Sequence, residues 1–375
     1  MALALGAAGA ALLALTWIGY PLAIALVAAL RRPAPPAHWP RLPRVTAVLA
    51  AREDAAVIEA RVRNWLASDY AGPLEVAVAH EPGYPWTPPT DLASRVRVVS
   101  GDAPGGKCAN LNAGVRAATG EVLVFGDAHQ LFVPGAITAL VNALGDPQLG
   151  AVSGQLEIPR GRAGLVSRAY WAYERRLRRH EALVHSTIGV SGAIYAMRAS
   201  LWEPLPPGLI LDDLHLPMRL VLAGHRVGFE PAAIATETRT VESRQEYRRK
   251  VRTLTGNFQL VTWRPALLVP LRNPVWLQFM LHKLARLATP YALLALVVGA
   301  AWAGATWYWP PSGKQLAVAG VAALWLSLSP DPVARRLRGV LTQFAALQAA
   351  TVMALANAVR GRWDIWQPHA RRPAP

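Results

Sequence analysis

The residues best suited to chemistry in this 375-residue chain are an aspartate and a histidine, separated by one residue at positions 127–129. They follow the run 121–125, which has the length and composition of a buried strand. Residues two apart in an extended strand end point the same way, so Asp127 and His129 can share one divalent cation, either Mg²⁺ or Mn²⁺. The alternative is that His129 is a surface loop residue, and the pair alone does not decide.

A second candidate is the pair Asp212 and Asp213, which directly follows a strand-like apolar run where the pattern indicates a helix start. Two carboxylates there can be a simple cap, because the helix dipole favours acids at its N-terminus. In the functional interpretation, one is a general base and its neighbour tunes it. Spacing alone leaves the two interpretations equal.

The elements that must position these acids alternate along the chain. Strand-like runs cover 45–51, 74–79, 95–100 and 121–125, and helical patterns separate them at 55–68 and 107–119. This alternation predicts an α/β fold with a mainly parallel sheet covered on both faces, and ligands of such sheets bind beyond the carboxyl ends of the strands. Polar residues follow the first two strands at 52–54 and 80–83. Each of these residues could be a loop residue or a helix cap, but polar residues that recur at the ends of successive strands predict a ligand-binding cleft.

Two basic runs allow several interpretations. The run 248–252 suggests nucleic-acid binding at first, but no recognised nucleic-acid module or aromatic platform accompanies it. Arginines that close over a diphosphate fit better, because the planar guanidinium matches phosphate oxygens, although a solvated or headgroup-facing helix is equally consistent with this run alone. The run 175–179 is interpreted mainly as a solvated or membrane-facing helix surface.

Composition indicates a membrane protein. The chain is 53% hydrophobic yet carries a net charge of +16, and residues 1–30 contain no charge, a length that suffices to cross a bilayer needing about 20 apolar residues. Further uncharged stretches cover 288–313, 315–330 and 340–359, and the last is the most polar of them and is expected to cross incompletely. Arginines that follow residue 30 predict an outer N-terminus and a cytoplasmic central domain.

At this point the chain resembles membrane-bound family 2 glycosyltransferases of the GT-A fold, in the cellulose and hyaluronan synthase-like branch, over roughly residues 43–265. A Gly-Lys-x-x-x-Leu-Asn-x-Gly segment is intact at 106–114, the Asp-x-Asp motif resembles 127–129, and the Glu-Asp pair resembles 212–213. The Gln-Arg-x-Arg-Trp motif falls on 249–253. The resemblance implies that Asp213 is the base, with Asp212 supporting it, and that the nucleotide sugar is bound by Ala50, Glu53, Glu81, Lys107, Asn112, Asp127, Arg249 and Arg252.

Three departures from the family pattern change the expectations. The turn that holds uridine reads His-Glu-Pro-Gly at 80–83, which leaves Glu81 as its acid. His129 replaces the second metal-binding aspartate, so whether the cofactor is Mn²⁺ or Mg²⁺ stays open. Thr253 replaces the tryptophan associated with a growing sugar chain, which favours single transfer over processive synthesis.

The resulting hypothesis is an inverting glycosyltransferase that moves a sugar from a nucleoside-diphosphate sugar, with UDP-sugar as the expected donor, to a lipid-linked or glycan acceptor. We expect an anchor at 1–32, a cytoplasmic GT-A domain at 33–264, interfacial amphipathic helices at 265–287 in contact with membrane lipids, a transmembrane region at 288–360 and a basic tail at 361–375. The expected location is the inner membrane. One rival is a membrane metallohydrolase, which requires its ligands within about 4 Å of a common centre or of two neighbouring ions; these ligands would be Asp127, His129, Asp212, Asp213 and His215. Another rival is a non-catalytic nucleotide-sugar-binding protein.

Overall fold

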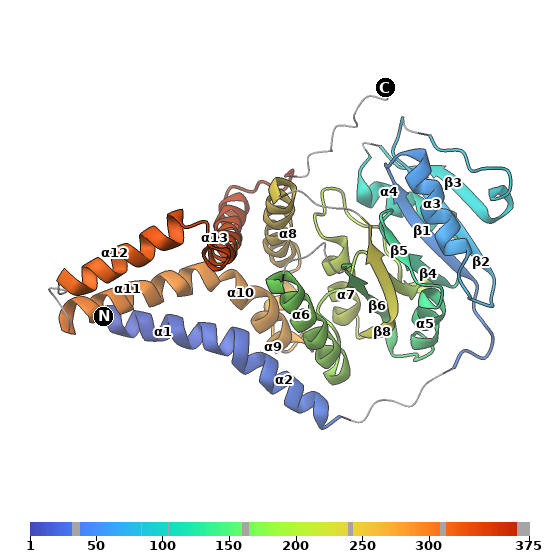
Figure 1. Cartoon of the computed structure of the whole chain (residues 1–375). Helices are drawn as coiled ribbons and strands as arrows, with labels where there is room; N and C mark the ends of the chain where they lie inside the picture. The colour runs from blue at the N-terminus through green and yellow to red at the C-terminus, as the bar shows by residue number, and fades with distance from the viewer. Residues whose placement is uncertain are drawn as a thin grey trace. The chain divides into compact units, whose positions relative to one another are not determined.

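The computed structural model of the chain describes residues 1–31, 38–83, 85–103, 105–159, 165–238, 243–307 and 313–365 (Figure 1). The chain divides into two compact units. One consists of Ile24–Thr240 and Gln259–Phe279, and the other consists of Met1–Ala23, Val241–Phe258 and Met280–Pro375. Within the expected transmembrane region 288–360, residues 308–312 lie outside the described residues, as do residues 366–375 of the expected basic tail and residue 32 of the expected anchor.

The first unit contains an eight-stranded sheet in the order β3-β2-β1-β4-β7-β6-β8-β5. Its parallel part confirms the four predicted strands as β1 (Val45–Ala51), β2 (Leu74–His80), β3 (Val96–Ser100) and β4 (Val122–Phe125). The two predicted helices are α3 (Ala55–Leu66) and α4 (Lys107–Ala117). Short 3₁₀ turns occupy Ala93–Arg95, Ala199–Leu201 and Pro265–Leu268.

The remaining strands make the sheet mixed. β7 (Tyr195–Arg198) runs antiparallel to both of its neighbours, β4 and β6 (Leu149–Glu157). β8 (Arg226–Glu237) is parallel to β6, and the short β5 (Gln130–Phe132) lies antiparallel to β8 at the edge. The connections are α5 (Ala136–Ala143), α6 (Leu165–Val184) and α7 (Asp212–Leu222). The parallel half therefore follows the local pattern, whereas the mixed half depends on pairing between distant segments.

The core forms where the central strands are apolar on both faces. Every residue of β4 is buried, as expected for a strand covered on both sides. Beside it, Arg61 of α3 is completely buried between the rings of Trp65 and Phe132, each with its centroid 4.1 Å from the guanidinium carbon. Burial lowers the pKa of Arg61, and the negative charge of Asp127 opposes that shift. A buried cation thus lies close to the loop that follows β4.

Most residues of the apolar helices belong to the second unit, whereas residues 24–29 and 276–279 of these helices group with the first unit. α1 (Ala2–Ala14) continues through a π-helical segment, Leu15–Gly19, into α2 (Tyr20–Ala29), and α13 covers Pro332–Val359. Ala2–Ala29 and Pro332–Val359 are each long and apolar enough to cross a membrane. The helical stretch Trp276–Leu287 meets Thr289–Gly304 at 61°, so this bent pair is a third candidate span or a re-entrant segment. It comprises α9 (Trp276–Gln278), the π-helical Phe279–Leu284, α10 (Ala285–Leu287) and the start of α11 (Thr289–Trp307).

Two further helices complete this description. α12 covers Gly313–Leu328, and α8 covers Ser243–Trp263. The stretch 340–359, expected to cross incompletely, lies within α13, which is 28 residues long and carries its arginines near its N-terminal end. This helix is long and apolar enough to cross a membrane.

Candidate functional site

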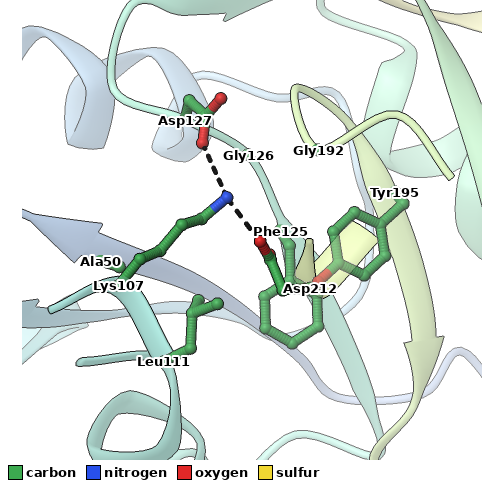
Figure 2. Close-up of a pocket in the computed structure, with 9 residues that line it drawn as sticks. All are labelled: Ala50, Lys107, Leu111, Phe125, Gly126, Asp127, Gly192, Tyr195 and Asp212. Carbon is green, nitrogen blue, oxygen red and sulfur yellow. Dashed lines mark ion pairs between the residues drawn. The ribbon is translucent and has the colours of Figure 1, made fainter. Parts of the chain in front are cut away.

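One pocket of the first unit gathers residues from five elements (Figure 2). It lies where β1 and β4 end and where α4, α7 and β7 begin, which is the strand-end position expected for an α/β sheet. Of the predicted site residues, Ala50, Lys107, Asp127 and Asp212 line it. The other lining residues are Leu111, Phe125, Gly126, Gly192 and Tyr195.

Lys107 joins the two acidic motifs of this pocket. Figure 2 shows its ion pairs with both carboxylates. Its Nζ lies 3.3 Å from Oδ1 of Asp127 and 3.2 Å from Oδ2 of Asp212. Burial alone would lower the pKa of Lys107, but the carboxylates of Asp127 and Asp212 raise it well above its usual value. Lys107 therefore remains a cation. Two acids that are 85 positions apart in the sequence share this one counter-charge.

The position of Lys107 follows from the start of α4. Gly106 precedes the helix with φ +96°, a conformation that favours glycine. Its N–H donates to Oε1 of Glu81 at 3.0 Å, and Nδ2 of Asn110 donates to Oε2 of the same carboxylate, also at 3.0 Å. Glu81 therefore fixes the first turn of α4 and positions Lys107.

Asp213 lies against the backbone that lines the pocket. A Cβ at Gly192 would come within 3.3 Å of Oδ2 of Asp213, so the missing side chain leaves room for the carboxylate. Burial and the neighbouring charge of Asp212 raise the pKa of Asp213 above its usual value, while Lys107 and Arg178 oppose the shift. A carboxylate with a raised pKa is better suited to accept a proton near neutral pH.

The backbone of Asp213 is held by an irregularity of α7. Pro217 lies four residues further along this helix and has no N–H, so it cannot donate to the carbonyl of Asp213. The N–H of Val190 donates to that carbonyl instead, at 2.9 Å. The segment that contains Gly192 is thereby tied to the start of α7.

Tyr195 is a pocket residue that the sequence reasoning missed. Its ring is 1% exposed and stacks on Phe125 with centroids 4.7 Å apart, and its hydroxyl has no hydrogen-bond partner among the described residues. Burial and the charge of Asp212 raise its pKa well above the usual value, so the hydroxyl keeps its proton and can donate it in a hydrogen bond. The antiparallel register pairs Tyr195 with Phe125, which places it in the pocket. The only sequence signal was the glycine-punctuated segment 189–196.

Three other predicted residues make contacts within the protein. The amide of Asn112 donates to the carbonyl of Leu205 at 2.9 Å and accepts from its N–H at 2.8 Å. Glu53 accepts from the N–H of Arg52 at 3.0 Å, and Glu81 anchors α4 as described. These residues do not line the pocket. Through these contacts the three residues can hold the loops that carry the lining residues, and so contribute to the site indirectly.

His129 does not have the geometry assumed from the sequence. β4 ends at Phe125, and residues 128–129 form a turn rather than an extended strand end, so the rule that residues two apart point the same way does not apply. The carbonyl of His129 accepts from Oγ1 of Thr238 at 2.7 Å. Asp127 lines the pocket, whereas His129 does not.

A divalent cation would find few protein ligands here. Among the described residues, no group of three or more His, Cys, Asp or Glu side chains is placed to hold a metal ion. The metallohydrolase hypothesis requires such a group. A cation at the half-exposed carboxylate of Asp127 would be compatible with the site if substrate phosphates and water completed its coordination, which is common for Mg²⁺.

The predicted diphosphate-binding arginines belong to the other unit. Arg249 and Arg252 lie on α8, within the part of that helix that groups with the apolar helices. Arg249 is exposed and Arg252 is half-buried.

Comparison with known proteins assigns the family. The model of the family described as "Glycosyltransferase like family 2" matches residues 43–256, which is more than half of the chain. The chain therefore belongs to this glycosyltransferase family. No curated protein matches it.

One solved structure shows the same fold over nearly the whole chain. A mannosyltransferase from Pyrobaculum calidifontis, solved with GDP-Man and Mn²⁺, matches with a TM-score of 0.67 and 23% identity over 96% of this chain and 99% of that chain. A glucosyl-3-phosphoglycerate synthase from Mycobacterium tuberculosis, solved with Mn²⁺, UDP and glucosyl-3-phosphoglycerate, matches with a TM-score of 0.40 and 18% identity over 64% and 82% of the two chains. The protein is thus a glycosyltransferase with a GT-A-like fold, as predicted.

Proposed function

We propose that the protein transfers a sugar from a nucleoside-diphosphate sugar to a hydroxyl group of an acceptor, with inversion at the anomeric carbon. The observation that carries this proposal is the pocket in which Lys107 joins Asp127 to Asp212, with Asp213 against its Gly192 wall. It combines a cation for phosphate oxygens with a carboxylate suited to remove a proton.

The donor diphosphate is assigned to the Lys107 and Asp127 side of the pocket. Lys107 stabilises the negative charge that grows on the leaving diphosphate. Asp127 is proposed to bind a divalent cation, Mn²⁺ or Mg²⁺, which would supply further charge neutralisation when bound, and His129, which does not line the pocket, is left out of this set. Ala50 contributes backbone surface, and Glu81 and Asn112 act by positioning. The family resemblance adds Glu53, Arg249 and Arg252 to the proposed donor-binding set.

Asp213 is proposed to act as the base. It takes the proton of the acceptor hydroxyl as the acceptor oxygen bonds to the anomeric carbon, and the bond from that carbon to the diphosphate breaks on the opposite side. The products are the glycosylated acceptor and a nucleoside diphosphate. Asp212 supports this step because its charge raises the pKa of Asp213.

The proposed setting is the inner membrane, with the N-terminus outside, the catalytic unit in the cytoplasm and a lipid-linked or glycan acceptor. Two helices long and apolar enough to cross a membrane support a membrane setting, and the basic residues after residue 30 support the orientation. The division into anchor, catalytic domain, interfacial helices, C-terminal membrane region and basic tail is part of this proposal. A single transfer per encounter is proposed because Thr253 stands at the position of the family tryptophan.

A donor screen on the purified full chain tests the proposal. Release of UDP and GDP is measured from UDP-sugars and GDP-sugars, with Mn²⁺, Mg²⁺ or a chelator present, and with a membrane lipid extract as acceptor source. We expect release from one donor class, with a sugar-bearing product formed in equal amount. Donor binding without any release in every condition would instead favour a nucleotide-sugar-binding protein. Loss of release with chelator, restored by Mn²⁺ or Mg²⁺, tests the proposed metal.

A further inference from the structure

A second pocket of the first unit is lined by the residue that precedes Gly192. Its lining comes from three elements: β6 at 154–156, one face of α6 from Trp171 to Arg178, and Phe229 of β8. Ser191 completes the lining. The N–H of Ser191 donates to Oγ of Ser153 at 2.9 Å, and that hydroxyl donates to the carbonyl of Gly154, also at 2.9 Å. These bonds tie Ser191 to β6 and fix this side of the pocket.

Ser191 and Gly192 form a wall shared by the two pockets. Ser191 lines the second pocket, and the next residue, Gly192, lines the first. Asp213 packs against Gly192, and the positive charge of Arg178, from the second pocket, acts on the Asp213 carboxyl. The proposed base therefore lies at the boundary between the two pockets. A transferase needs this arrangement, because the base must reach an acceptor that binds beside the donor.

The second pocket is basic on one helix face. Arg175 and Arg178 are three residues apart, so both fall on the same face of α6, and both are half-buried in the pocket. Arg176 and Arg179 are exposed and do not line it. The basic run was interpreted from sequence as one solvated or membrane-facing surface, and the structure corrects that for half of its arginines. Glu174 also lines the pocket and is buried, which leaves one excess positive charge among these three side chains.

This chemistry points to a particular kind of acceptor. A guanidinium presents a planar set of donors that matches the oxygens of phosphate or carboxylate. We infer that the second pocket is the acceptor subsite and that Arg175 and Arg178 bind an anionic phosphate or phosphodiester group of the acceptor, whose hydroxyl then faces Asp213. Trp171 supplies an apolar surface for the carbon skeleton beside that group. The inference rests on the proposed function and specifies its acceptor class.

Binding of small phosphate compounds to the full chain tests this inference. The probes are glycerol 1-phosphate, uncharged glycerol, and vesicles of phosphatidylglycerol or phosphatidylcholine, each titrated into the purified protein with its donor nucleotide present. The variants Arg175→Gln and Arg178→Gln are compared with Arg176→Gln and Arg179→Gln, which remove the same charge from the exposed face of the same helix. We expect Kd for the phosphate probe to rise about tenfold or more in the first two variants and to stay within about twofold in the controls.

The two kinds of phosphate probe distinguish a soluble compound from a lipid headgroup as the source of the phosphate group. Selective binding of glycerol 1-phosphate supports a soluble phosphorylated acceptor, and selective binding of phosphatidylglycerol vesicles supports a lipid headgroup. Equal weakening in all four variants would overturn the inference, because it would mean that only overall charge matters. Equal binding of glycerol and glycerol 1-phosphate would also overturn it. In either of these cases the wild-type protein would still bind its donor and release nucleoside diphosphate. If the wild-type protein releases no nucleoside diphosphate, the proposed function itself is wrong.

Discussion

The backbone N–H of Val190 donates to the backbone carbonyl of Asp213 at 2.9 Å, a bond between the segment that lines both pockets and the helix that carries the proposed base. It exists because Pro217 cannot supply the helical N–H that this carbonyl would otherwise accept. A helix irregularity thus holds the proposed base against the wall formed by Ser191 and Gly192.

Replacing Pro217 by alanine tests the purpose of this irregularity. Pro217→Ala supplies an N–H that competes with Val190 for the carbonyl of Asp213, so we expect kcat to fall severalfold. The free energy of unfolding should hold or rise, because proline inside a helix costs about 3 kcal/mol. Steady-state kinetics and thermal unfolding measure the two effects. A drop in stability together with activity would contradict this explanation, since it would point to simple misfolding.

Lys107 offers a second test, since it is the cation between Asp127 and Asp212. Lys107→Gln removes the charge that is proposed to face the donor diphosphate, and we expect kcat/KM to fall roughly 10²–10³-fold. Arg63→Gln is the control, because Arg63 forms exposed ion pairs with Glu59 and Asp91 away from the pocket. Kinetics that match wild type in Lys107→Gln would remove this residue from the proposed mechanism.

Asp213 links activity to pH. Its pKa is raised in the folded state, and a base must be deprotonated, so kcat/KM should rise with pH through an apparent pKa above the usual aspartate value of about 3.9. Asp213→Asn should lower kcat roughly 10²–10⁴-fold and leave donor binding measurable. Full activity in this variant would exclude Asp213 as the base.

The same shift makes a prediction about stability. A carboxyl whose folded pKa exceeds its unfolded pKa binds its proton more tightly in the folded state, so its ionisation destabilises the fold as pH rises between the two values. Asp213→Asn removes that ionisation, so its stability should exceed that of the wild type at neutral pH and the difference should shrink in acid. Thermal unfolding measured across pH checks the sign.

Replacing Tyr195 should change protein stability and donor affinity in opposite directions. Its buried hydroxyl lacks a partner among the described residues, so Tyr195→Phe should stabilise the free protein by about 1 kcal/mol. If the hydroxyl donates to an oxygen of the bound donor, the same variant should weaken donor affinity or kcat/KM about tenfold. Calorimetric titration with the active donor nucleotide provides the test. Unchanged affinity and kinetics would mean that Tyr195 only packs against Phe125.

The sequence predicted those parts of the site that local patterns encode. The strands at 45–51 and 121–125 are continuous apolar runs, and the motifs at 106–114, 127–129 and 212–213 placed Lys107, Asp127 and Asp212, which the structure brings into one pocket. Tyr195 could not be found in this way, because its position depends on antiparallel pairing with a strand 70 residues earlier. The split of the run 175–179 depends on tertiary packing, because helical periodicity places Arg179, four residues after Arg175, as close to Arg175 as it places Arg178. Motif matching also could not show that the amide of Asn112 is occupied by the backbone of Leu205.

The apolar helices of the second unit provide the last prediction. α1 and α11 approach closely at Gly6 and Gly299, where a Cβ on Gly299 would lie 2.6 Å from the Cα of Gly6. Small residues allow such backbone contact between helices in lipid, where packing rather than hydrophobic burial drives association. Gly299→Val should therefore lower the free energy of unfolding in detergent by about 1–3 kcal/mol. Gly304→Val is the matched control on the same helix, because a Cβ there meets nothing within 4 Å. If both variants unfold at the wild-type temperature, the close approach of α1 and α11 contributes no stability. If both are equally destabilised, the cause is valine in the helix rather than the contact with Gly6.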